Sequence, residues 1–493
     1  MEIKKVLLVI PPSYTFKSYR DINPLPPIGL GYLASILEGL DIEVKILDCL
    51  VRGWYQEREV DDKIVQVGLA AEEIKEQVRD YEPDLVGLSC QFSRQYKMYH
   101  QVLGVVKEAK PGVITVAGGA HVSVCPSEVL GDPCCDFVLI GEAEESFKEL
   151  ILALIQGSDL EAVDGLGWKT NGSLKINEKQ RWLKNLDAIP FPAYHLMELD
   201  RYFGLPASHG KRHRHRFCPI VTSRGCPAKC TFCSARRVWG DKYRFRSVEN
   251  VIQEMRILKS QFGIEELMFE DDNVTANPKR ARSLFAAMIQ EGFNFIWDTP
   301  NGIGVWSIDE ALIDLMRQSG CINLNFPVES GSQEILDKVI QKPLNLEKVK
   351  KLITYCKKIN LDCNLFLVVG MPGEKIADIW KSFQFAADCG CYNPLISVAT
   401  PYPGTKLLED CQANGYLARG FALDDLFIRS FMIATSDWSE KELRHILIKG
   451  QIYLLARMAL ENTGELVKRL GMGIRNPGIF YAYLKRFFGP LLG

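Results

Sequence analysis

The sequence has no long apolar run and almost no net charge. Its longest apolar stretches, such as the one from Leu365 to Val369, are far shorter than the roughly 20 residues that a membrane-spanning helix requires. Its 59 Lys and Arg residues nearly balance its 61 Asp and Glu residues, which leaves a formal net charge of -2. The sequence therefore predicts no transmembrane segment and no global attraction to nucleic acid or to anionic membranes.

The sequence also lacks a secretion signal at its start. A short polar stretch runs straight into a strand-like segment, Val6 to Ile10, without the features of a signal peptide. The 15 cysteines are spread over 493 residues, which is unlike the disulfide framework of a short secreted chain. We therefore expect a reducing, cytoplasmic location, in which thiols are free to bind metal.

Composition and periodicity predict a globular α/β protein. The chain is 47% hydrophobic and 24% charged, which excludes disordered and fibrous classes. Up to residue 155, short β-branched runs alternate with helical segments, as in a parallel sheet covered by helices. The expected strands are 6–10, 43–47, 85–89, 114–117 and 137–140, and the expected helices are 28–40, 70–80, 96–109 and 144–154. Residues 1–155 are thus predicted to form a Rossmann-like doubly wound domain, with its ligand at the carboxyl ends of the strands.

Three further regions follow this domain. Residues 156–216 are turn-rich and polar, and we expect a linker or an inter-domain bridge there. Residues 217–414 carry a second βα series, which predicts a partial (β/α)6 barrel with its chemistry at the carboxyl ends of the strands. Its strands are expected at 219–223, 267–271, 295–299, 322–328, 363–369 and 395–400. Residues 415–493 are expected to form a helical, increasingly basic C-terminal extension.

Three cysteines stand close together after the first strand of the second series. Cys226, Cys230 and Cys233 are four and then three positions apart, in a loop where the thiolates can surround a cubane cluster. A 4Fe-4S cluster usually takes four Cys ligands, so three leave one iron open to a substrate or cofactor. A chance group of thiols and an incomplete zinc site are the other interpretations. The position after a strand, and Phe232 between the last two cysteines, favour the cluster.

This CxxxCxxC motif, at the start of a six-stranded partial barrel, resembles that of the radical S-adenosylmethionine (SAM) enzymes. The resemblance implies that Cys226, Cys230 and Cys233 are both metal ligands and catalytic residues. It further implies that the open iron holds the amino and carboxylate groups of SAM. An electron from the cluster then cleaves this cofactor to methionine and a 5′-deoxyadenosyl radical, which calls for an electron donor such as a flavodoxin or ferredoxin.

Polar motifs at the ends of three later strands extend the resemblance. In the family, the second strand ends beside the methionine part of SAM, the fourth carries a ribose-binding side chain, and the fifth meets the adenine. Each such motif alone is more often a helix cap than a ligand site, but at successive strand ends they together favour a cofactor site. The expected SAM-binding residues are Phe232, Asp271, Asp272, Glu329, Ser330, Gly370 and Pro372.

The N-terminal domain resembles the cobalamin-binding half of the B12-binding radical SAM enzymes. The similarity lies in Pro11-Pro12, in residues 26–34 and in two Gly-containing segments, 118–121 and 141–144, and overall it covers residues 6 to about 414. It implies cobalamin contacts at Ser89, Gln91, Ser93, Gly118, Gly119, His121, Gly141 and Glu142. Helix capping explains the two serines equally well, and a turn histidine that points to solvent is the alternative for His121.

The DxHxxG motif, through which some other cobalamin proteins offer a histidine to cobalt, is absent. None of the seven His residues stands in that frame. In the radical subfamily this absence implies a cobalt without a protein histidine below it. It also leaves open a domain that has kept its shape and lost its corrinoid, because a fold alone does not establish a ligand.

Two basic segments lie outside these motifs. We expect the run 211–216 to be a solvated linker face, with a patch for an anionic substrate or an electron donor as the alternative. The tail 468–488 combines cationic and aromatic residues, which favours a helix packed over the core. Peripheral contact with a membrane surface is the alternative for the tail, and it would suit a lipid-like substrate. No nucleic-acid partner is expected, since the basic run lacks interleaved aromatic residues.

These features together predict a cobalamin-dependent radical SAM methyltransferase, acting on an unactivated carbon of a small-molecule or lipid-like substrate. The resemblance implies that the adenosyl radical abstracts a substrate hydrogen and that the substrate radical takes a methyl group from methylcobalamin. The alternative with the same cofactors is oxidative cyclisation or carbon-carbon coupling. A carrier of corrinoid or electrons without turnover is a third interpretation, for which the motifs at the strand ends would be superfluous.

Overall fold

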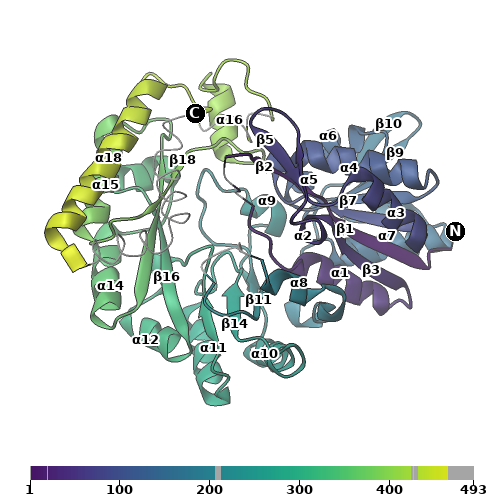
Figure 1. The fold of residues 1–493 in the computed structure, drawn as a ribbon, viewed down its shortest axis with the longest axis horizontal. Coiled ribbons are helices and arrows are strands. Elements are labelled where there is room, and N and C mark those ends of the chain that lie inside the picture. The colour runs from purple at the N-terminus through teal and green to yellow at the C-terminus, as the bar shows by residue number, and fades with distance from the viewer. Residues whose placement is uncertain are drawn as a thin grey trace. The chain divides into compact units, whose positions relative to one another are not determined.

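The structure, a computed structural model, describes residues 2–464 except 19, 21, 206–211, 424–425 and 427–430. The chain divides into two compact units, and Figure 1 shows its elements in order from purple to yellow. The first unit consists of Met1–Pro227, Ser234–Asp272 and Gln290–Ile296. The second unit consists of Ala228–Cys233, Asn273–Ile289 and Trp297–Gly493.

The first unit contains a seven-stranded sheet in the order β10-β9-β8-β7-β6-β1-β3. Its parallel strands are β1 (Lys5–Ile10), β3 (Glu43–Asp48), β6 (Leu85–Ser89), β7 (Ile114–Gly118) and β8 (Phe137–Leu139). Residues 6–9 of β1 are all buried, as expected of a parallel strand covered on both faces. Counted along the chain, the parallel strands follow the order 2-1-3-4-5, so the order reverses between β1 and β6. The Rossmann-like prediction is confirmed, and ligands of such sheets bind outside the strand ends at this reversal.

All four helices that the sequence predicts in this domain are present. They are α1 (Ile28–Glu38), α3 (Ala71–Tyr81), α4 (Tyr96–Ala109) and α7 (Glu144–Gln156), with the shorter α2 (Cys49–Arg52), α5 (Ala120–Val124) and α6 (Pro126–Gly131) between them. Helix α3 shows why the spacing of apolar residues predicts these helices. Ile74 and Val78, one turn apart, are buried, whereas Glu72 and Glu76 are exposed.

Two features of the first unit differ from the sequence expectation. Strands β9 (Leu166–Thr170) and β10 (Ser173–Ile176) form an antiparallel hairpin within 156–216, where we expect irregular linker sequence. Its turn is Asn171-Gly172, and both residues have positive φ, as two-residue hairpin turns require. A small antiparallel sheet of β2 (Ser13–Phe16), β4 (Glu57–Glu59) and β5 (Ile64–Val67) was also not predicted, because strands of three or four residues carry little periodicity.

The second sheet has six strands in the order β11-β14-β15-β16-β17-β18, and the partial (β/α)6 barrel is confirmed. The strands are β11 (Phe217–Ile220), β14 (Glu266–Phe269), β15 (Ile296–Asp298), β16 (Cys321–Glu329), β17 (Asp362–Val369) and β18 (Leu395–Val398). The helices between them are α10 (Val248–Phe262), α11 (Pro278–Glu291), α12 (Glu310–Gln318), α14 (Leu346–Lys358) and α15 (Ile376–Asp388). All six expected strands are therefore present.

Among the described residues after the barrel strands, the helices α16 (Lys406–Ala413) and α18 (Glu440–Glu461) are present. Helix α18 begins at a capping box, in which the Ser439 hydroxyl accepts from the Glu442 N–H and the Glu442 carboxylate accepts from the Ser439 N–H. It packs against α15, and Figure 1 shows the two side by side. In the part of the chain that the structure describes, every helix falls short of the length or the hydropathy needed to cross a bilayer. The tail 468–488 lies outside the described residues.

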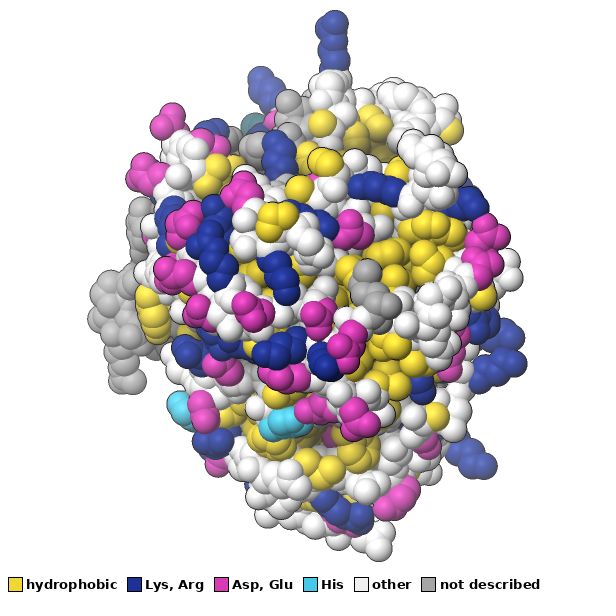
Figure 2. All heavy atoms as spheres, turned by 90° about the vertical axis from the view of Figure 1, so that its right-hand side faces the viewer, with side chains coloured by type: hydrophobic (Ala, Val, Ile, Leu, Met, Phe, Trp, Pro, Cys, Tyr) yellow, Lys and Arg dark blue, Asp and Glu magenta, His cyan; other side chains and the backbone are white. Residues whose placement is uncertain are grey.

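The basic run is described from residue 212 onward, and residue 211 lies outside the described residues. His213, Arg214 and His215 are exposed, as expected of a solvated face. Arg212 differs, because its guanidinium donates hydrogen bonds to three backbone carbonyl groups at the end of α8 (Leu199–Phe203) and just beyond it. On the face of the molecule in Figure 2, Lys and Arg side chains intermingle with Asp and Glu side chains, so no charge of one sign gathers there.

Candidate functional site

The three predicted cluster cysteines lie between β12 (Ser223–Arg224) and α9 (Ala235–Trp239). Cys226 belongs to the first unit, and Cys230 and Cys233 belong to the second. All 15 cysteines fall in the described part of the chain; Cys233 is exposed and the other two are partly exposed, whereas nine of the remaining twelve are buried. Burial raises the pKa of a thiol such as Cys218 and disfavours the thiolate. The cysteines of the motif therefore have the accessibility that cluster ligands need.

Two carboxylates at the end of β14 hold the backbone that leads into the cysteine motif. We call residues 222–225 the lead-in. Asp271 Oδ2 accepts from the Thr222 N–H at 3.0 Å, and Asp271 Oδ1 accepts from the Thr222 hydroxyl at 2.8 Å. Asp272 Oδ2 accepts from the Gly225 N–H at 3.0 Å, and burial raises the pKa of Asp272 to about 6. Both carboxylates thus shape the lead-in, while their predicted contact with SAM stays a prediction.

Thr231, between the last two cysteines of the motif, is fastened to a π-helix at Leu336–Ile340. Its N–H donates to the Ile340 carbonyl and its hydroxyl donates to the Val339 carbonyl, both at 3.0 Å. Its own carbonyl accepts from the Leu407 N–H at 2.8 Å. Single π-helical turns are frequent at functional sites, and this one presents carbonyl groups to the cysteine loop. The sequence analysis did not single out Thr231.

The end of β16 carries a buried ion pair. Glu329 Oε1 lies 2.8 Å from Lys342 Nζ, and both side chains are 7% exposed. Glu329 has φ 69°, a left-handed conformation that is costly for a residue with a Cβ and that clusters at active sites. Ser330 is buried, and its hydroxyl accepts from the Ser332 N–H at 3.2 Å. The predicted SAM-binding residues of this strand end are thus engaged with protein groups, and Lys342 was not predicted.

Glu374 closes the turn that follows β17. Its Oε2 accepts from the Gly370 N–H at 2.7 Å and from the Met371 N–H at 3.2 Å. Oε1 has no hydrogen-bond partner among the described residues. Burial raises the pKa of Glu374 to about 8, so the carboxyl is protonated at neutral pH, with Oε1 as the oxygen free to carry the proton. The residue therefore shapes the backbone at Gly370 and Met371, in the turn where the resemblance predicts the adenine.

The carboxyl edge of the first sheet gathers several predicted cobalamin contacts. Ser89 ends β6 and Gly118 ends β7, and the Cys90 N–H donates to the Gly118 carbonyl at 2.8 Å. Gln91 is exposed in the loop after β6, and Phe92 beside it is 62% exposed. An exposed aromatic ring close to polar backbone groups fits the edge of a large, partly apolar ligand.

His121 is buried and uses both of its ring nitrogens. Nδ1 lies 3.0 Å from the Ser93 hydroxyl, and Nε2 lies 3.3 Å from Glu128 Oε2. Glu128 Oε1 lies 3.0 Å from His100 Nε2. With 1% of its surface exposed, His121 is not a solvent-facing turn residue, and that alternative is wrong. Because protein groups engage both nitrogens, the ring is not free to bind cobalt, which agrees with the missing DxHxxG motif.

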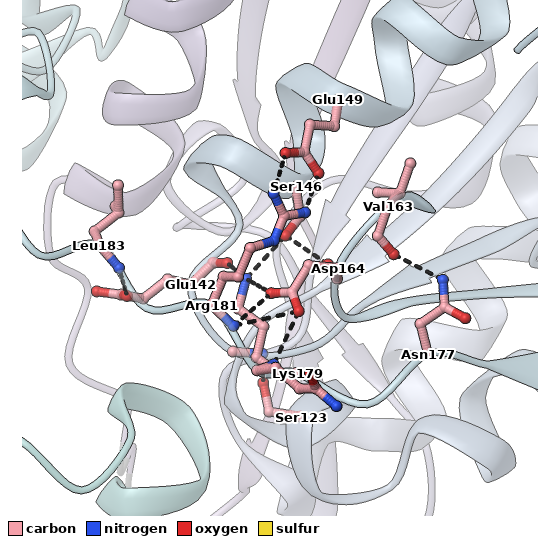
Figure 3. A network of polar contacts seen from close by, with 12 residues as sticks. Ser123, Glu142, Ser146, Glu149, Val163, Asp164, Asn177, Lys179, Arg181 and Leu183 are labelled. Carbon is pink, nitrogen blue, oxygen red and sulfur yellow. Dashed lines mark hydrogen bonds and ion pairs between the residues drawn. The ribbon is translucent and has the colours of Figure 1, made fainter. Parts of the chain in front are cut away.

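Glu142 points its carboxylate at two arginines. Oε1 accepts from Arg224 Nη1 at 2.9 Å, and Oε2 accepts from Arg244 Nη1 at 2.6 Å. Figure 3 shows a further contact of the Glu142 carboxylate, with the N–H of Leu183. A Cβ on the neighbouring Gly141 would lie 3.0 Å from the Trp182 ring, so the absence of a side chain permits this close approach. The structure therefore brings Glu142 to the lead-in, and a cobalamin contact at this residue stays a prediction.

Comparison with known proteins identifies the family. Residues 220–386 match the Radical SAM superfamily, and residues 23–151 match the B12 binding domain. Cytidylyl-2-hydroxyethylphosphonate methyltransferase of Streptomyces wedmorensis is 34% identical over 448 residues, which cover 84% of this chain and 83% of that protein. The chain belongs to the B12-binding radical SAM enzymes. The predicted family is confirmed.

Two further proteins are similar to this B12-binding radical SAM enzyme. The anaerobic magnesium-protoporphyrin IX monomethyl ester cyclase of Rubrivivax gelatinosus is 25% identical over 413 residues, which cover 82% of this chain and 69% of the cyclase. The solved radical SAM methyltransferase TsrM of Kitasatospora setae, with tryptophan and a SAM analogue bound, aligns with a TM-score of 0.69 at 17% identity. That alignment covers 92% of this chain and 89% of TsrM, and it shows a shared fold.

Membership of the family gives this B12-binding radical SAM enzyme its cofactors: SAM, a 4Fe-4S cluster and cobalamin. The residues fit these groups, since the thiols of the cysteine motif are accessible and Phe92 is exposed at the edge of the first sheet. Within the described ranges, no three His, Cys, Asp or Glu side chains converge as ligands of a single metal ion. The thiolates of a cubane bind different irons, so they need not converge in that way.

The sequence analysis missed several residues of this B12-binding radical SAM enzyme that shape the site. They are Arg224, Thr231, Arg244, Lys342 and Glu374. The partners Glu142 and Arg224 are separated by 82 positions along the chain, so no local pattern links them. Glu374 is different, because it stands in the same Gly-containing turn as the predicted residues Gly370 and Pro372. A carboxylate four residues after the start of such a turn is a local signal that it caps backbone N–H groups.

Proposed function

We propose that this B12-binding radical SAM enzyme transfers a methyl group to an unactivated carbon of a small molecule. The observation that supports this proposal is the 34% identity to a named methyltransferase over most of both chains. When bound, the cluster and SAM supply a 5′-deoxyadenosyl radical, and methylcobalamin supplies the methyl group. The chain itself holds these groups, orients the substrate and excludes water.

We propose the following division of labour. Cys226, Cys230 and Cys233 ligate the cluster, and Asp271 and Asp272 set the lead-in before it. Phe232 and the predicted residues at the ends of β14, β16 and β17 surround SAM, and the predicted residues at the carboxyl edge of the first sheet surround cobalamin. The corresponding domains are 1–155 for cobalamin, 156–216 as a bridge, 217–414 for radical chemistry and 415–493 as a helical extension.

We propose a small, anionic substrate to test first. The Streptomyces wedmorensis relative is named for cytidylyl-2-hydroxyethylphosphonate, which makes this nucleotide-linked phosphonate the first candidate. A low-potential flavodoxin or ferredoxin is the proposed electron donor. Peripheral membrane contact through the tail 468–488 is a separate proposal, which sedimentation of the full chain with anionic vesicles tests by comparison with a chain that ends at residue 464.

Anaerobic reconstitution tests the enzyme in two steps. The first measures 5′-deoxyadenosine made from SAM in the presence of a chemical reductant, and we expect more product than in a Cys230→Ala variant. The second follows the label from methyl-labelled SAM into the candidate substrate. Wild-type protein that holds a cluster yet forms no 5′-deoxyadenosine would contradict a radical reaction.

Ring closure is the second candidate, because the alignment with the Rubrivivax gelatinosus cyclase spans 82% of this chain. In that reaction the substrate loses hydrogen and gains no methyl group. Mass spectrometry of the product separates the two. An increase by one labelled methyl group supports transfer, whereas a loss of hydrogen without added label supports ring closure.

A further inference from the structure

Arg224 lies two residues before the first cluster cysteine and is buried between carboxylates and rings. Its Nη1 donates to Glu142 Oε1 at 2.9 Å, and its Nη2 donates to Glu144 Oε1 at 2.5 Å. The guanidinium also lies over the rings of Tyr32 and Trp239. The Arg224 side chain is 5% exposed and that of Glu142 is 2% exposed, so water does not screen the ion pair. The lead-in is therefore tied to the loop after β8.

A second arginine completes this charge cluster. Arg244 Nη1 donates to both oxygens of Glu142, at 2.8 and 2.6 Å, and to the Leu183 carbonyl at 2.8 Å. The Leu183 N–H donates to Glu142 Oε2 at 3.2 Å. Two arginines thus face two glutamates, Glu142 and Glu144, and the buried charges balance. Neutralising or shortening one of the four leaves another charge buried without its partner, which is strongly unfavourable.

A strap from the bridge region holds the glutamate-bearing loop in place. We call residues 177–183 the strap. Lys179 Nζ donates to the Glu142 carbonyl and to the Ser146 hydroxyl, both at 2.8 Å, and lies 3.2 Å from Asp164 Oδ2. Figure 3 shows these contacts converging on Lys179. Because all three N–H donors of the ammonium group have a partner, the strap has a defined position against the loop that carries Glu142.

The chain of contacts runs from the strap to the lead-in and Cys226, all within the first unit. The strap fixes residues 141–144, and Glu142 and Glu144 fix Arg224. On its other side the lead-in is fixed by Asp271 and Asp272. Since one residue separates Arg224 from Cys226, a shift of the guanidinium displaces the cysteine as well.

We propose that Arg224 is a positioning residue for the cluster, and that the N-terminal domain supports the first cluster cysteine through Glu142 whether or not cobalamin is bound. This inference rests on the proposed radical chemistry. It gives the cobalamin-type domain a second role, because the carboxylates that order the lead-in come from the loop after its last parallel strand. A purely structural ion pair would change the stability of the fold and leave the environment of the cluster unaltered.

The test compares Arg224→Lys and Glu142→Gln with wild type in the reconstituted full chain. Lysine keeps the positive charge but lacks the planar fork whose two Nη atoms reach Glu142 and Glu144 separately. Glutamine keeps the shape of Glu142 without its charge. Arg52→Lys is the matched control, since Arg52 donates two hydrogen bonds to Glu198 elsewhere in the same unit. The readouts are iron per chain, the electron paramagnetic resonance spectrum of the reduced cluster with and without SAM, cobalamin affinity, and the rate of 5′-deoxyadenosine formation.

We expect Arg224→Lys to bind cobalamin within about twofold of wild type. Both test variants should show an altered spectrum with SAM and form 5′-deoxyadenosine at least tenfold more slowly. The Arg52→Lys control should match wild type in the spectrum and the rate. A folded Arg224→Lys or Glu142→Gln variant with the spectrum and rate of wild type would overturn the positioning role. Wild-type protein that holds its cluster but does not cleave SAM would instead contradict the proposed function. In that case the spectra of the variants and of wild type would still test the positioning role.

Hydrogen exchange of the wild-type protein covers the case in which neither variant folds. If the ion pairs join the two segments, amides of 222–225 should exchange as slowly as those of 141–144, in the protein without cobalamin. Fast exchange of the lead-in beside a protected loop would overturn the inference. This measurement needs no activity and no substitution.

Discussion

The hydroxyl of Thr231 donates a hydrogen bond to the carbonyl oxygen of Val339 at 3.0 Å. Thr231 is 5% exposed, so this bond is shielded from water. It joins the loop between Cys230 and Cys233 to a π-helix more than 100 residues later, and the Thr231 N–H makes a second bond to that helix at Ile340. The cysteine loop therefore depends on contacts that local sequence does not supply.

We expect Thr231→Val to loosen the cluster. The variant keeps the shape of the side chain but leaves the partly buried Val339 carbonyl without this donor, at a cost of about 1 kcal/mol. Reconstituted protein should lose iron to a chelator several times faster than wild type. Thr231→Ser retains the hydroxyl and serves as the control. Identical rates of iron loss for the Val variant and wild type would show that this bond does not hold the loop.

Glu374 makes stability depend on pH. Burial raises its pKa from 4.5 to about 8, so between these values the folded state binds more protons than the unfolded state. The free energy of unfolding therefore falls as pH rises through this range, by at most about 1.4 kcal/mol per pH unit. Glu374→Gln cannot ionise and should lack this contribution. Denaturant unfolding across the range measures it, and equal slopes for both proteins would contradict the prediction.

Glu128 gives the opposite dependence at acid pH. Burial opposes its ionisation, but hydrogen bonds from His100 and His121 outweigh burial and lower the pKa of Glu128 to about 2. The stability that this carboxylate contributes is present above its ordinary pKa of 4.5 and is lost as pH falls toward 2. Glu128→Gln should remove that loss and lower the raised pKa of His100, which nuclear magnetic resonance of the imidazole measures.

An exposed pair provides the control for the Glu128 experiment. His195 Nε2 lies 2.9 Å from Glu38 Oε1, and both side chains face solvent. Surface ion pairs contribute about 0 to 1 kcal/mol, so Glu38→Gln should hardly change stability at any pH. If Glu128→Gln behaves in the same way as the surface variant, the hydrogen bonds from His100 and His121 contribute nothing measurable to stability.

Gly118 and Gly119 should respond differently to the same substitution. A Cβ on Gly119 would lie 2.4 Å from the Cys90 carbonyl oxygen, and the residue has φ +111°. Gly119→Ala should therefore destabilise the fold by about 1 to 3 kcal/mol. A Cβ on Gly118 meets nothing within 4 Å, so Gly118→Ala should preserve the melting temperature. If cobalamin lies against this edge, Gly118→Ala should nevertheless weaken its binding, which absorbance titration measures.

The local pattern of apolar and polar residues predicts much of the architecture. The strands of the first sheet that begin at Lys5, Leu85 and Ile114 are short apolar runs bounded by polar or Gly residues, and each was predicted to within one or two residues. The hairpin at Asn171-Gly172 was not predicted although its turn signal is present, because its strands β9 and β10 are too short to show a clear period.

Residue type and spacing by themselves determined the cysteine motif, the two βα series and the family, because each is carried by neighbours along the chain. Only the tertiary structure decided what surrounds the motif. Arg224 meets Glu142, and Thr231 meets Val339, across more than 80 intervening positions. Burial makes these contacts strong by removing water from around charges and carbonyl groups, and burial at one residue is a property of the whole fold rather than of the residues beside it.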